Sequence, residues 1–237
     1  MGIKIANRII GKGQPVFVVA EACDNHLGNM ATAKKMIKNA MLAGADCIKF
    51  QHHLPDEEML PNVPMSDNFR EPLYEFLKKY ALSIDQHKEL LNYCKDVGVI
   101  YLCTPFSYKA ACELKEICVN SFKIGSGEMT DIASLKAISA LGNSMIISTG
   151  MSTLEEVKRT YLAMKDWGAP FAFTHCVSEY PPNYEDMNLR VIKTLMAEFP
   201  DIVIGHSDHT PDNFTSFAAV ALGAKIIEKH VILDKNI

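Results

Sequence analysis

Eight short apolar runs, separated by polar turns and helical segments, are the feature of this 237-residue sequence that most restricts its fold. The runs are almost continuous in apolar character, as expected of strands that are buried on both faces of a parallel sheet. They are VFVVAEA from Val16, CIKFQ from Cys47, VIYLCTPF from Val99, SFKIGS from Ser121, MIISTG from Met145, FAFTHCV from Phe171, IVIGHSD from Ile202 and KIIEKHV from Lys225. Strands that alternate with helices predict a parallel sheet, and eight such units are the number that a (β/α)8 TIM barrel needs.

Helix signals lie between these runs. The segment from Met30 to Leu42 has apolar residues at the spacing of one helical face. Ser152 and Glu155 have the spacing of a capping box, which predicts that a helix begins there. Thr210, which precedes a proline, predicts another helix start, and residues 131–141 give a weaker helix signal.

The eighth run is followed at once by the last residues of the sequence, so no eighth helix is expected. We predict one TIM-barrel catalytic domain over residues 1–237, an α/β fold with its eighth helix truncated. Such a barrel closes its ring of hydrogen bonds but leaves strands eight and one poorly covered on the outside. We expect a dimer contact, as in a homodimer, or a missing segment at that position.

One connection is much longer than the others. From Gln51 to Val99 the chain covers nearly twice the length of a βα unit, and it includes the stretch HHLPDEEMLPNVPMSDNF. The stretch is rich in Pro, Asp and Asn, and it follows the second predicted strand. A loop of this length at the active-site end of a barrel is typical of a functional element such as a lid.

Composition excludes several classes of protein. The formal charge is −4 and no dense stripe of Lys and Arg is present, so a nucleic-acid partner is not expected. The seven Cys form no C-x-x-C pair, which favours a reduced, cytoplasmic protein. No stretch approaches 18 apolar residues, so neither a membrane span nor a signal peptide is expected.

The active site of such a barrel lies at the carboxyl ends of its strands. Polar residues are dense at these positions, whereas the strand interiors are apolar, and burying one charged side chain without a partner costs several kcal/mol. In strand order they are Glu21, Asn25, His26; Lys49, Gln51; Thr104; Lys123, Ser126, Glu128; Ser148, Thr149, Gly150; His175, Ser178, Tyr180; Ser207, Asp208, His209; Glu228 and His230.

Two lysines and several small residues within this set favour a site for a phosphate together with a carboxylate. Lys49 and Lys123 supply ammonium groups, and Ser126 and Ser148 lie beside glycines whose backbone N–H groups can approach an anion. The structural alternative is that both lysines form core ion pairs with Glu21, Glu128 or Glu228.

His209 and His230 end neighbouring strands, with Glu21, Asp208 and Glu228 near them in the predicted barrel. Two imidazoles and a carboxylate suit a divalent transition metal, but the same residues also suit acid–base chemistry. The other histidines in the long connection and its helix, His52, His53 and His87, are interpreted as loop or helix-surface residues. A nucleophilic pair of His175 and Cys176 is disfavoured, because neighbours in a strand point to opposite faces.

Together these strand ends resemble the sialic acid synthase family, whose members condense phosphoenolpyruvate with an N-acetylated hexosamine. The resemblance covers residues 15–236. It is carried by EACDNH at Glu21, KFQ at Lys49, CTPF at Cys103, FKIGSGE at Phe122, ISTGM at Ile147, THCVSEYP at Thr174, YEDMNL at Tyr184, SDHT at Ser207 and EKH at Glu228. EACDNH departs mildly from the family at Cys23 and Asp24.

The resemblance implies a role for each site residue. The phosphoenolpyruvate pocket would consist of Lys49, Gln51, Thr104, Lys123, Ser126, Ser148, Ser178 and Tyr180; position 178 is often Asn or Thr in relatives. His209 and His230 would be ligands of Mn²⁺ or Mg²⁺. Glu21 would be a catalytic carboxylate, and Asn25, Glu128 and Glu228 would line the side of the acceptor sugar.

The resemblance also implies a part that this sequence lacks. Relatives continue past the eighth strand into a further helix and a small antifreeze-like domain, which reaches over a partner's barrel and supplies an Arg to the sugar. We therefore expect the phosphoenolpyruvate and metal half of the site to be present here and part of the sugar half to be absent.

Two other functions remain open on sequence grounds. A Schiff-base aldolase would use Lys123 or Lys229 as its nucleophilic amine. A truncated barrel could instead bind phosphoenolpyruvate or a partner without turnover. The acceptor sugar is also open between N-acetylmannosamine and 6-deoxy diacetamido analogues.

Overall fold

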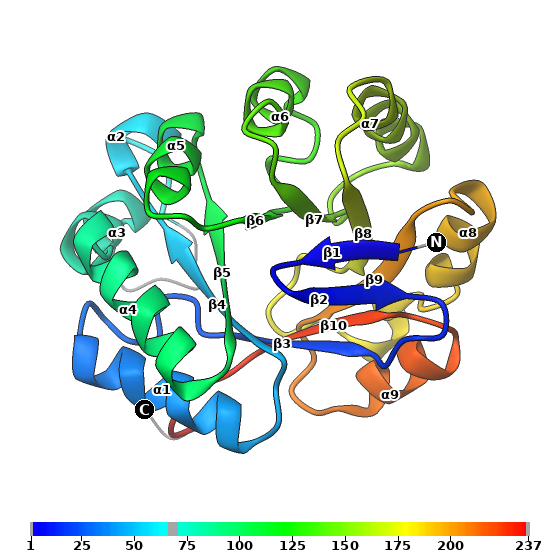
Figure 1. The fold of residues 1–237 in the computed structure, drawn as a ribbon. Helices are drawn as coiled ribbons and strands as arrows, with labels where there is room; N and C mark the ends of the chain where they lie inside the picture. Colours follow the sequence, from blue (N-terminus) through cyan, green and yellow to red (C-terminus); the bar gives the residue numbers. More distant parts are fainter. Residues whose placement is uncertain (1, 66–70, 236–237) are drawn as a thin grey trace.

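A computed structural model, which describes residues 2–65 and 71–235, has the predicted (β/α)8 barrel (Figure 1). Eight parallel strands close in the order β10-β3-β4-β5-β6-β7-β8-β9. The strands are β3 (Phe17–Glu21), β4 (Cys47–His52), β5 (Ile100–Pro105), β6 (Ser121–Ile124), β7 (Ser144–Ser148), β8 (Phe171–Cys176), β9 (Val203–Asp208) and β10 (Ile226–His230). All eight predicted runs are therefore barrel strands.

Helices surround the barrel and pack on the outward-facing strand residues. They are α1 (Met30–Leu42), α2 (Pro55–Glu58), α3 (Leu73–Tyr80), α4 (Ile84–Val97), α5 (Tyr108–Glu116), α6 (Ile132–Ser139), α7 (Leu154–Asp166), α8 (Val191–Glu198) and α9 (Phe214–Ala221), with a 3-10 turn at Tyr184–Met187. The prediction over residues 30–42 is confirmed in full, and the segment after Asp131 is a helix that Asp131 caps.

Two predicted helix starts are wrong in position. The capping box of α7 pairs Thr153 with Glu156, one residue after the predicted pair. The helix expected to begin after Thr210 starts at Phe214 instead. Thr210 is held by a different interaction, because its backbone N–H and its hydroxyl both donate to the carboxylate of Asp208.

Residues 2–11, for which no strand was predicted, form an antiparallel hairpin of β1 (Gly2–Ile5) and β2 (Arg8–Gly11). The hairpin lies across the front of the barrel in Figure 1. Its apolar residues share a second core cluster with inward-facing residues from the amino-terminal halves of the strands: Ile3, Ile5, Ile10, Phe17, Val19, Cys47, Leu102, Ile146, Ala172, Val203 and Ile226. The hairpin thus closes the amino-terminal end with apolar side chains and leaves the carboxyl end for polar ones.

Strand register then decides which polar residues meet inside the barrel. Glu21 lies opposite Lys49 on one side and opposite His230 on the other, and Gln51 lies opposite Thr104. Because side chains alternate between faces along a strand, the residues two positions before these also face inward.

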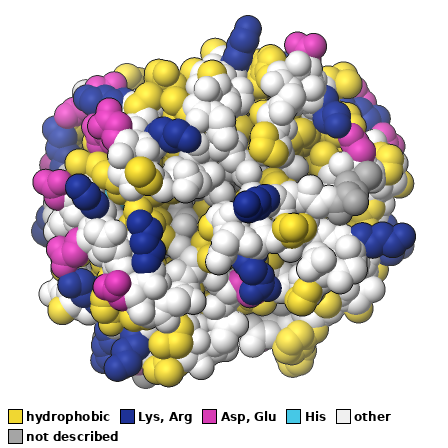
Figure 2. Space-filling view, in the orientation of Figure 1, with side chains coloured by type: hydrophobic (Ala, Val, Ile, Leu, Met, Phe, Trp, Pro, Cys, Tyr) yellow, Lys and Arg dark blue, Asp and Glu magenta, His cyan; other side chains and the backbone are white. Residues whose placement is uncertain are grey.

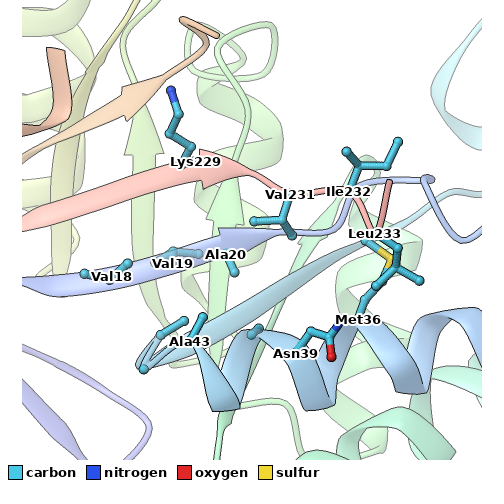
Figure 3. A pocket seen from close by; sticks show the side chains of 13 residues that line it. Val18, Val19, Ala20, Met36, Asn39, Ala43, Lys229, Val231, Ile232 and Leu233 are labelled. Atoms are coloured by element: carbon cyan, nitrogen blue, oxygen red, sulfur yellow. The ribbon is translucent and has the colours of Figure 1, made fainter. Parts of the chain in front are cut away.

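The outer surface of β10 and β3 is incompletely covered, as predicted from the truncated eighth unit. A groove of about 420 Å³ lies there, and its wall includes Val18, Ala20, Met36, Val231 and Leu233 (Figure 3). Val18, on the outward face of β3, is 40% exposed. Among the described residues no helix follows β10. What covers this groove in the assembled protein, a dimer contact or a further segment, stays a prediction.

The long connection after β4 contains α2, α3 and α4, so much of it is helical rather than an open loop. Residues 66–69, which belong to the predicted lid, lie outside the described residues. On the face shown in Figure 2, basic and acidic side chains are interspersed among apolar and neutral ones. No helix in the described ranges is long and apolar enough to cross a bilayer.

Candidate active site

Four charged side chains meet at the centre of the barrel. The Lys49 ammonium lies 2.7 Å from the Glu21 carboxylate and 3.4 Å from that of Glu228, and Lys123 lies 3.6 Å from Glu228. All four side chains are at most 5% exposed. Each comes from a different strand, β3, β4, β6 or β10, so only closure of the barrel brings them together.

Hydroxyl and amide groups complete the contacts of this charged cluster. Lys49 donates to the hydroxyl of Thr104 at 3.2 Å and Lys123 donates to Ser148 at 2.7 Å. Gln51 Nε2 donates to Glu21 Oε1 at 2.9 Å. Ser207, from β9, donates to Glu228 at 2.9 Å. Seven strands therefore contribute to this network of ion pairs and hydrogen bonds at the carboxyl end of the barrel.

The ion pairs of the structural alternative are present between the lysines and Glu21 and Glu228, while no ion pair of Glu128 is found among the described residues. Both carboxylates share one cation, because Oε2 of Glu21 and Oε2 of Glu228 face the same Lys49 ammonium, at 2.7 Å and 3.4 Å. In the described part of the chain neither of these oxygens has a further hydrogen-bond partner. A buried cluster of interacting charged groups is typical of a functional site.

The surroundings separate the acid–base properties of the two carboxylates. Burial raises the pKa of Glu21 despite the attraction of Lys49. Burial would also raise the pKa of Glu228, but Lys123 and Lys49 outweigh it and lower that pKa to about 2. Glu21 is therefore the carboxylate that can exchange a proton, and Glu228 stays ionised. Such divergent pairs mark acid–base sites.

The pKa values of the two lysines also shift in opposite directions. Burial lowers the pKa of Lys123. Burial acts on Lys49 too, but Glu21 and Glu228 raise its pKa above the usual lysine value. Lys49 therefore stays protonated, whereas Lys123 loses its proton more readily. A Schiff-base aldolase would use an unprotonated lysine amine, so this difference favours Lys123 for that alternative.

His209 and His230 lie side by side, with ring centroids 5.3 Å apart, and the Tyr180 ring stacks on His209 at 4.0 Å. His209 Nδ1 lies 2.8 Å from the carbonyl of Val177, an acceptor, so this nitrogen carries a proton and Nε2 is left as a lone-pair donor. Burial lowers the pKa of both rings to about 4, which keeps them in the neutral form that binds metals. The pair fits a divalent ion, although no group of three metal-binding side chains is found in the described ranges.

Small residues in the loops that follow β6, β7 and β8 approach one another closely. The backbone N–H of Gly150 donates to the hydroxyl of Ser126 at 3.1 Å. A Cβ at Gly150 would meet Ser126 Oγ at 2.7 Å and would also collide with the hydroxyl of Ser178. The absence of a side chain at Gly150 therefore keeps both serine hydroxyls at one place, as an oxyanion-binding pocket requires.

A cavity of about 700 Å³ opens from the charged cluster towards α2 and α3. Predicted site residues Asn25, Gln51, Glu128, Tyr180 and His230 line it. Asn25 donates to the carbonyl of Val231, so it also fixes the chain after β10. Burial raises the pKa of Glu128, whose Oε2 has no hydrogen-bond partner.

Two residues near the predicted histidine site point out of the barrel. The Asp208 carboxylate accepts from the hydroxyls of Thr210, Thr215 and Ser216, and it lies 3.1 Å from the Lys229 ammonium. The expectation that Asp208 lies near the two imidazoles holds along the chain only, because its carboxylate points to the other side of the strand. Lys229 faces the same side, which leaves Lys123 as the inward lysine that a Schiff-base alternative could use.

The interpretation of His52, His53 and His87 as loop or helix-surface residues is right in position for His53, which follows β4, but wrong for His52, a residue of β4, and for His87, a buried residue of α4. All three are buried, with exposed fractions of 1%, 6% and 0%. His52 contacts Glu113, and His87 contacts the hydroxyl of Tyr101. These partners are distant in sequence, and no spacing signal could have identified them.

Cys176 faces inward, whereas His175 bonds the carbonyl of Met187. The predicted separation of Cys176 from His175 thus holds. The structure instead brings the Cys176 sulfur to 3.9 Å from His209 Nε2, a contact that sequence reasoning missed.

Comparison with known proteins agrees with this geometry. N-acetylneuraminate-9-phosphate synthase of Mus musculus is 37% identical over 234 residues, which cover 97% of this chain and 65% of that protein. N,N'-diacetyllegionaminic acid synthase of Campylobacter jejuni is 36% identical over 228 residues, covering 92% of this chain and 68% of that protein. The chain thus spans about two thirds of the length of the curated relatives it matches.

A crystal structure of N-acetylneuraminic acid synthetase from Leptospira borgpetersenii, in complex with citrate, superposes with a TM-score of 0.89. Its sequence identity is 33%, and the match covers 100% of this chain and 80% of that chain. A family model described as the NeuB family matches residues 36–237. With these matches and the polar network at the carboxyl end of its barrel, the chain belongs to the NeuB family.

Proposed function

We propose that this chain carries the phosphoenolpyruvate-binding and metal-binding part of a nonulosonic acid synthase, which condenses phosphoenolpyruvate with an acetamido sugar and releases phosphate. The observation that carries the proposal is the buried cluster of Lys49, Lys123, Glu21 and Glu228 beside His209 and His230, in a chain of the NeuB family. The named relatives that make N-acetylneuraminate 9-phosphate and diacetyllegionaminic acid support this class of reaction.

The two lysines hold the anionic substrate. When phosphoenolpyruvate binds, its phosphate and carboxylate replace the present carboxylate contacts of Lys49 and Lys123. The hydroxyls of Ser126 and Ser148 and the N–H groups near Gly150 donate to its oxygen atoms. Holding two reactants in the reacting geometry can supply about 7–11 kcal/mol of the barrier.

The reaction balances with water as the one further reactant. C3 of phosphoenolpyruvate attacks the aldehyde carbon of the open-chain sugar, forming the C–C bond, and the aldehyde oxygen takes up a proton from Glu21. Positive charge develops at C2, water adds there, and a proton passes from that water back to Glu21. The bond between C2 and the bridging oxygen then breaks, the C2 hydroxyl gives its proton to the departing phosphate, and the C2 ketone and inorganic phosphate are left. Burial, which raises the pKa of Glu21, suits this carboxylate to the proton transfer.

His209 and His230 would hold the Mn²⁺ or Mg²⁺ ion, which supplies Lewis-acid polarisation of the aldehyde oxygen when it is bound. The neutral state of both rings and the Val177 carbonyl next to His209 Nδ1 support this assignment. Glu128 and Asn25, across the same cavity as His230, would contact the acceptor sugar.

A Schiff-base aldolase is the second candidate, since burial lowers the pKa of the inward-facing Lys123. Borohydride reduction in the presence of pyruvate separates the two functions. A synthase gains no mass on Lys123, whereas an aldolase is trapped as the reduced adduct and is identified by peptide mass spectrometry.

Phosphate release tests the proposed function. The chain, and in parallel the longest protein that carries it, is incubated with phosphoenolpyruvate, Mn²⁺ and one of three sugars: N-acetylmannosamine, a 4-acetamido-6-deoxy analogue, or its altrose counterpart. We expect phosphate release with at least one sugar in the longer protein, and a large loss on adding a chelator. Lack of phosphate release with every 2-acetamido sugar would overturn the proposal.

Metal binding gives a readout that needs no turnover. We expect the His209→Ala variant to bind Mn²⁺ at least about tenfold more weakly than wild type in titrations followed by electron paramagnetic resonance, because half of the protein ligands are lost. His175→Ala, which removes a buried imidazole outside the barrel, is the matched control and should bind as wild type does. Equal affinity in the wild type and both variants would contradict the assigned metal site.

A further inference from the structure

His53 is a buried imidazole at the end of β4 that the proposed reaction does not use. It is 6% exposed and its ring stacks on Phe106 at 4.3 Å. His53 lines the same cavity as Gln51, Asp24 and Glu58. Its position next to the charged cluster raises the question of what its two ring nitrogens do.

Both nitrogens of His53 face oxygen atoms. Nδ1 lies 2.8 Å from Glu58 Oε1, and Nε2 lies 3.0 Å from the amide oxygen of Gln51. A second carboxylate oxygen, from Asp24, lies 3.6 Å from Nε2. The other oxygen of Glu58 accepts the backbone N–H of Leu54 at 3.1 Å, as an ionised carboxylate does.

The orientation of Gln51 is fixed from its other end. Its Nε2 donates to Glu21 Oε1, so its amide oxygen must face His53. A flipped amide would bring the Gln51 oxygen against the Glu21 carboxylate and a donor against His53 Nε2, losing one hydrogen bond and adding repulsion. The Gln51 oxygen can only accept a hydrogen bond, so His53 Nε2 is the donor of this contact and carries a proton.

The cavity around the ring is lined by acidic side chains. They are Asp24 from the loop after β3, Glu58 from α2 and Glu128 from the loop after β6. In the described part of the chain, the only basic partner within 4 Å of Glu58 is His53. The contact of His53 with Glu58 therefore ties α2 to the end of β4.

We propose that His53 is a positioning residue for the condensation: held in place by Glu58, it donates from Nε2 to the Gln51 amide oxygen and so fixes that amide, whose N–H group orients the Glu21 carboxylate. This role rests on the proposed function of Glu21. The chain of contacts runs from α2 through Glu58, His53 and Gln51 to Glu21. It gives the connection after β4 a defined task, because that connection supplies both His53 and Glu58.

Two substitutions separate positioning from packing. In His53→Gln, the side-chain amide nitrogen replaces Nε2 and can still donate to Gln51. In His53→Asn, the amide nitrogen replaces Nδ1 and can reach Glu58 but not Gln51. We expect His53→Asn to lower kcat about 10- to 100-fold, with the KM for phosphoenolpyruvate nearly unchanged, because a misplacement of about 1 Å can cost a factor of 100. His53→Gln should recover most of that loss.

His52→Gln is the matched control. His52 is the preceding residue, is also buried and also contacts a glutamate, Glu113, but it lies outside the cavity. Its kcat should equal that of wild type. Equal losses in His53→Asn and His53→Gln would show that His53 acts through packing alone and would overturn the proposal.

A spectroscopic measurement tests the protonation of His53 independently of turnover. In ¹⁵N-histidine spectra of the wild-type protein at neutral pH, the resonances missing from His53→Gln identify the ring. We expect its Nε2, which faces the Gln51 oxygen, to carry a proton. A bare Nε2 would overturn the proposal. Because this readout needs no substrate, its failure is distinguishable from failure of the proposed synthase activity.

Discussion

The Lys49→Met variant is expected to unfold with a free energy about 3–5 kcal/mol lower than that of wild type. Lys49 is the cation nearest to Glu21, at 2.7 Å, and it also lies 3.4 Å from Glu228. Removing it leaves two buried carboxylates with one remaining ammonium, that of Lys123, at 3.6 Å from Glu228. Urea unfolding followed by circular dichroism measures the loss.

The pH dependence of this variant has a definite sign. Burial already raises the pKa of Glu21 above its ordinary value of 4.5, and losing Lys49 raises it further. The folded variant then binds a proton at Glu21 more readily than the unfolded chain does. Its free energy of unfolding should therefore fall as pH rises from 4.5 towards the raised pKa, so the loss is smaller at pH 5 than at pH 8.

Lys158→Met is the control for this measurement. Lys158 on α7 pairs with Glu198 at 3.1 Å, but its side chain is 36% exposed, so its loss should change stability by less than about 1 kcal/mol. Adding Glu21→Gln to Lys49→Met should restore part of the stability, because one buried charge is removed. A Lys49→Met variant as stable as the Lys158 control would contradict the buried cluster.

Replacing Glu21 with glutamine should lower kcat about 10²- to 10⁴-fold, the usual contribution of general acid–base catalysis. Glutamine keeps the shape and an oxygen acceptor for Lys49, but it cannot exchange a proton. The affinity for phosphoenolpyruvate should change little, because the lysines and serine hydroxyls that hold it remain. Phosphate-release kinetics measure kcat, and calorimetry measures the binding of phosphoenolpyruvate.

Asp208→Asn is the control variant for Glu21→Gln. Both residues end barrel strands, but Asp208 faces outward, where it is bonded by Thr210, Thr215 and Ser216. The folded fraction of Asp208→Asn should keep the wild-type kcat. If Glu21→Gln also kept it, Glu21 would not be the residue that transfers the proton.

The sequence was sufficient to predict the barrel because its strands are local features. Each strand is a continuous apolar run ended by polar residues, and the eight runs at βα spacing permit few other folds. The same logic grouped Lys49, Lys123, Glu21 and Glu228, since the carboxyl ends of the strands of a closed barrel meet at one active site. The amino-terminal hairpin was missed because its strands are only four residues long.

The direction in which each side chain near the site points, and the partner that it contacts, depend on the folded arrangement of the whole barrel. Asp208 and Lys229 are as close in sequence to His209 and His230 as any residue, yet the alternation of strand faces turns them outward to pair with each other. The sequence around His53 is typical of a loop and does not show its partners. In the folded protein the carboxylate of Glu58 and the amide of Gln51 contact its two ring nitrogens. Periodicity in a sequence determines which segments are buried, but contacts between different strands and loops depend on register and closure, which no single segment contains.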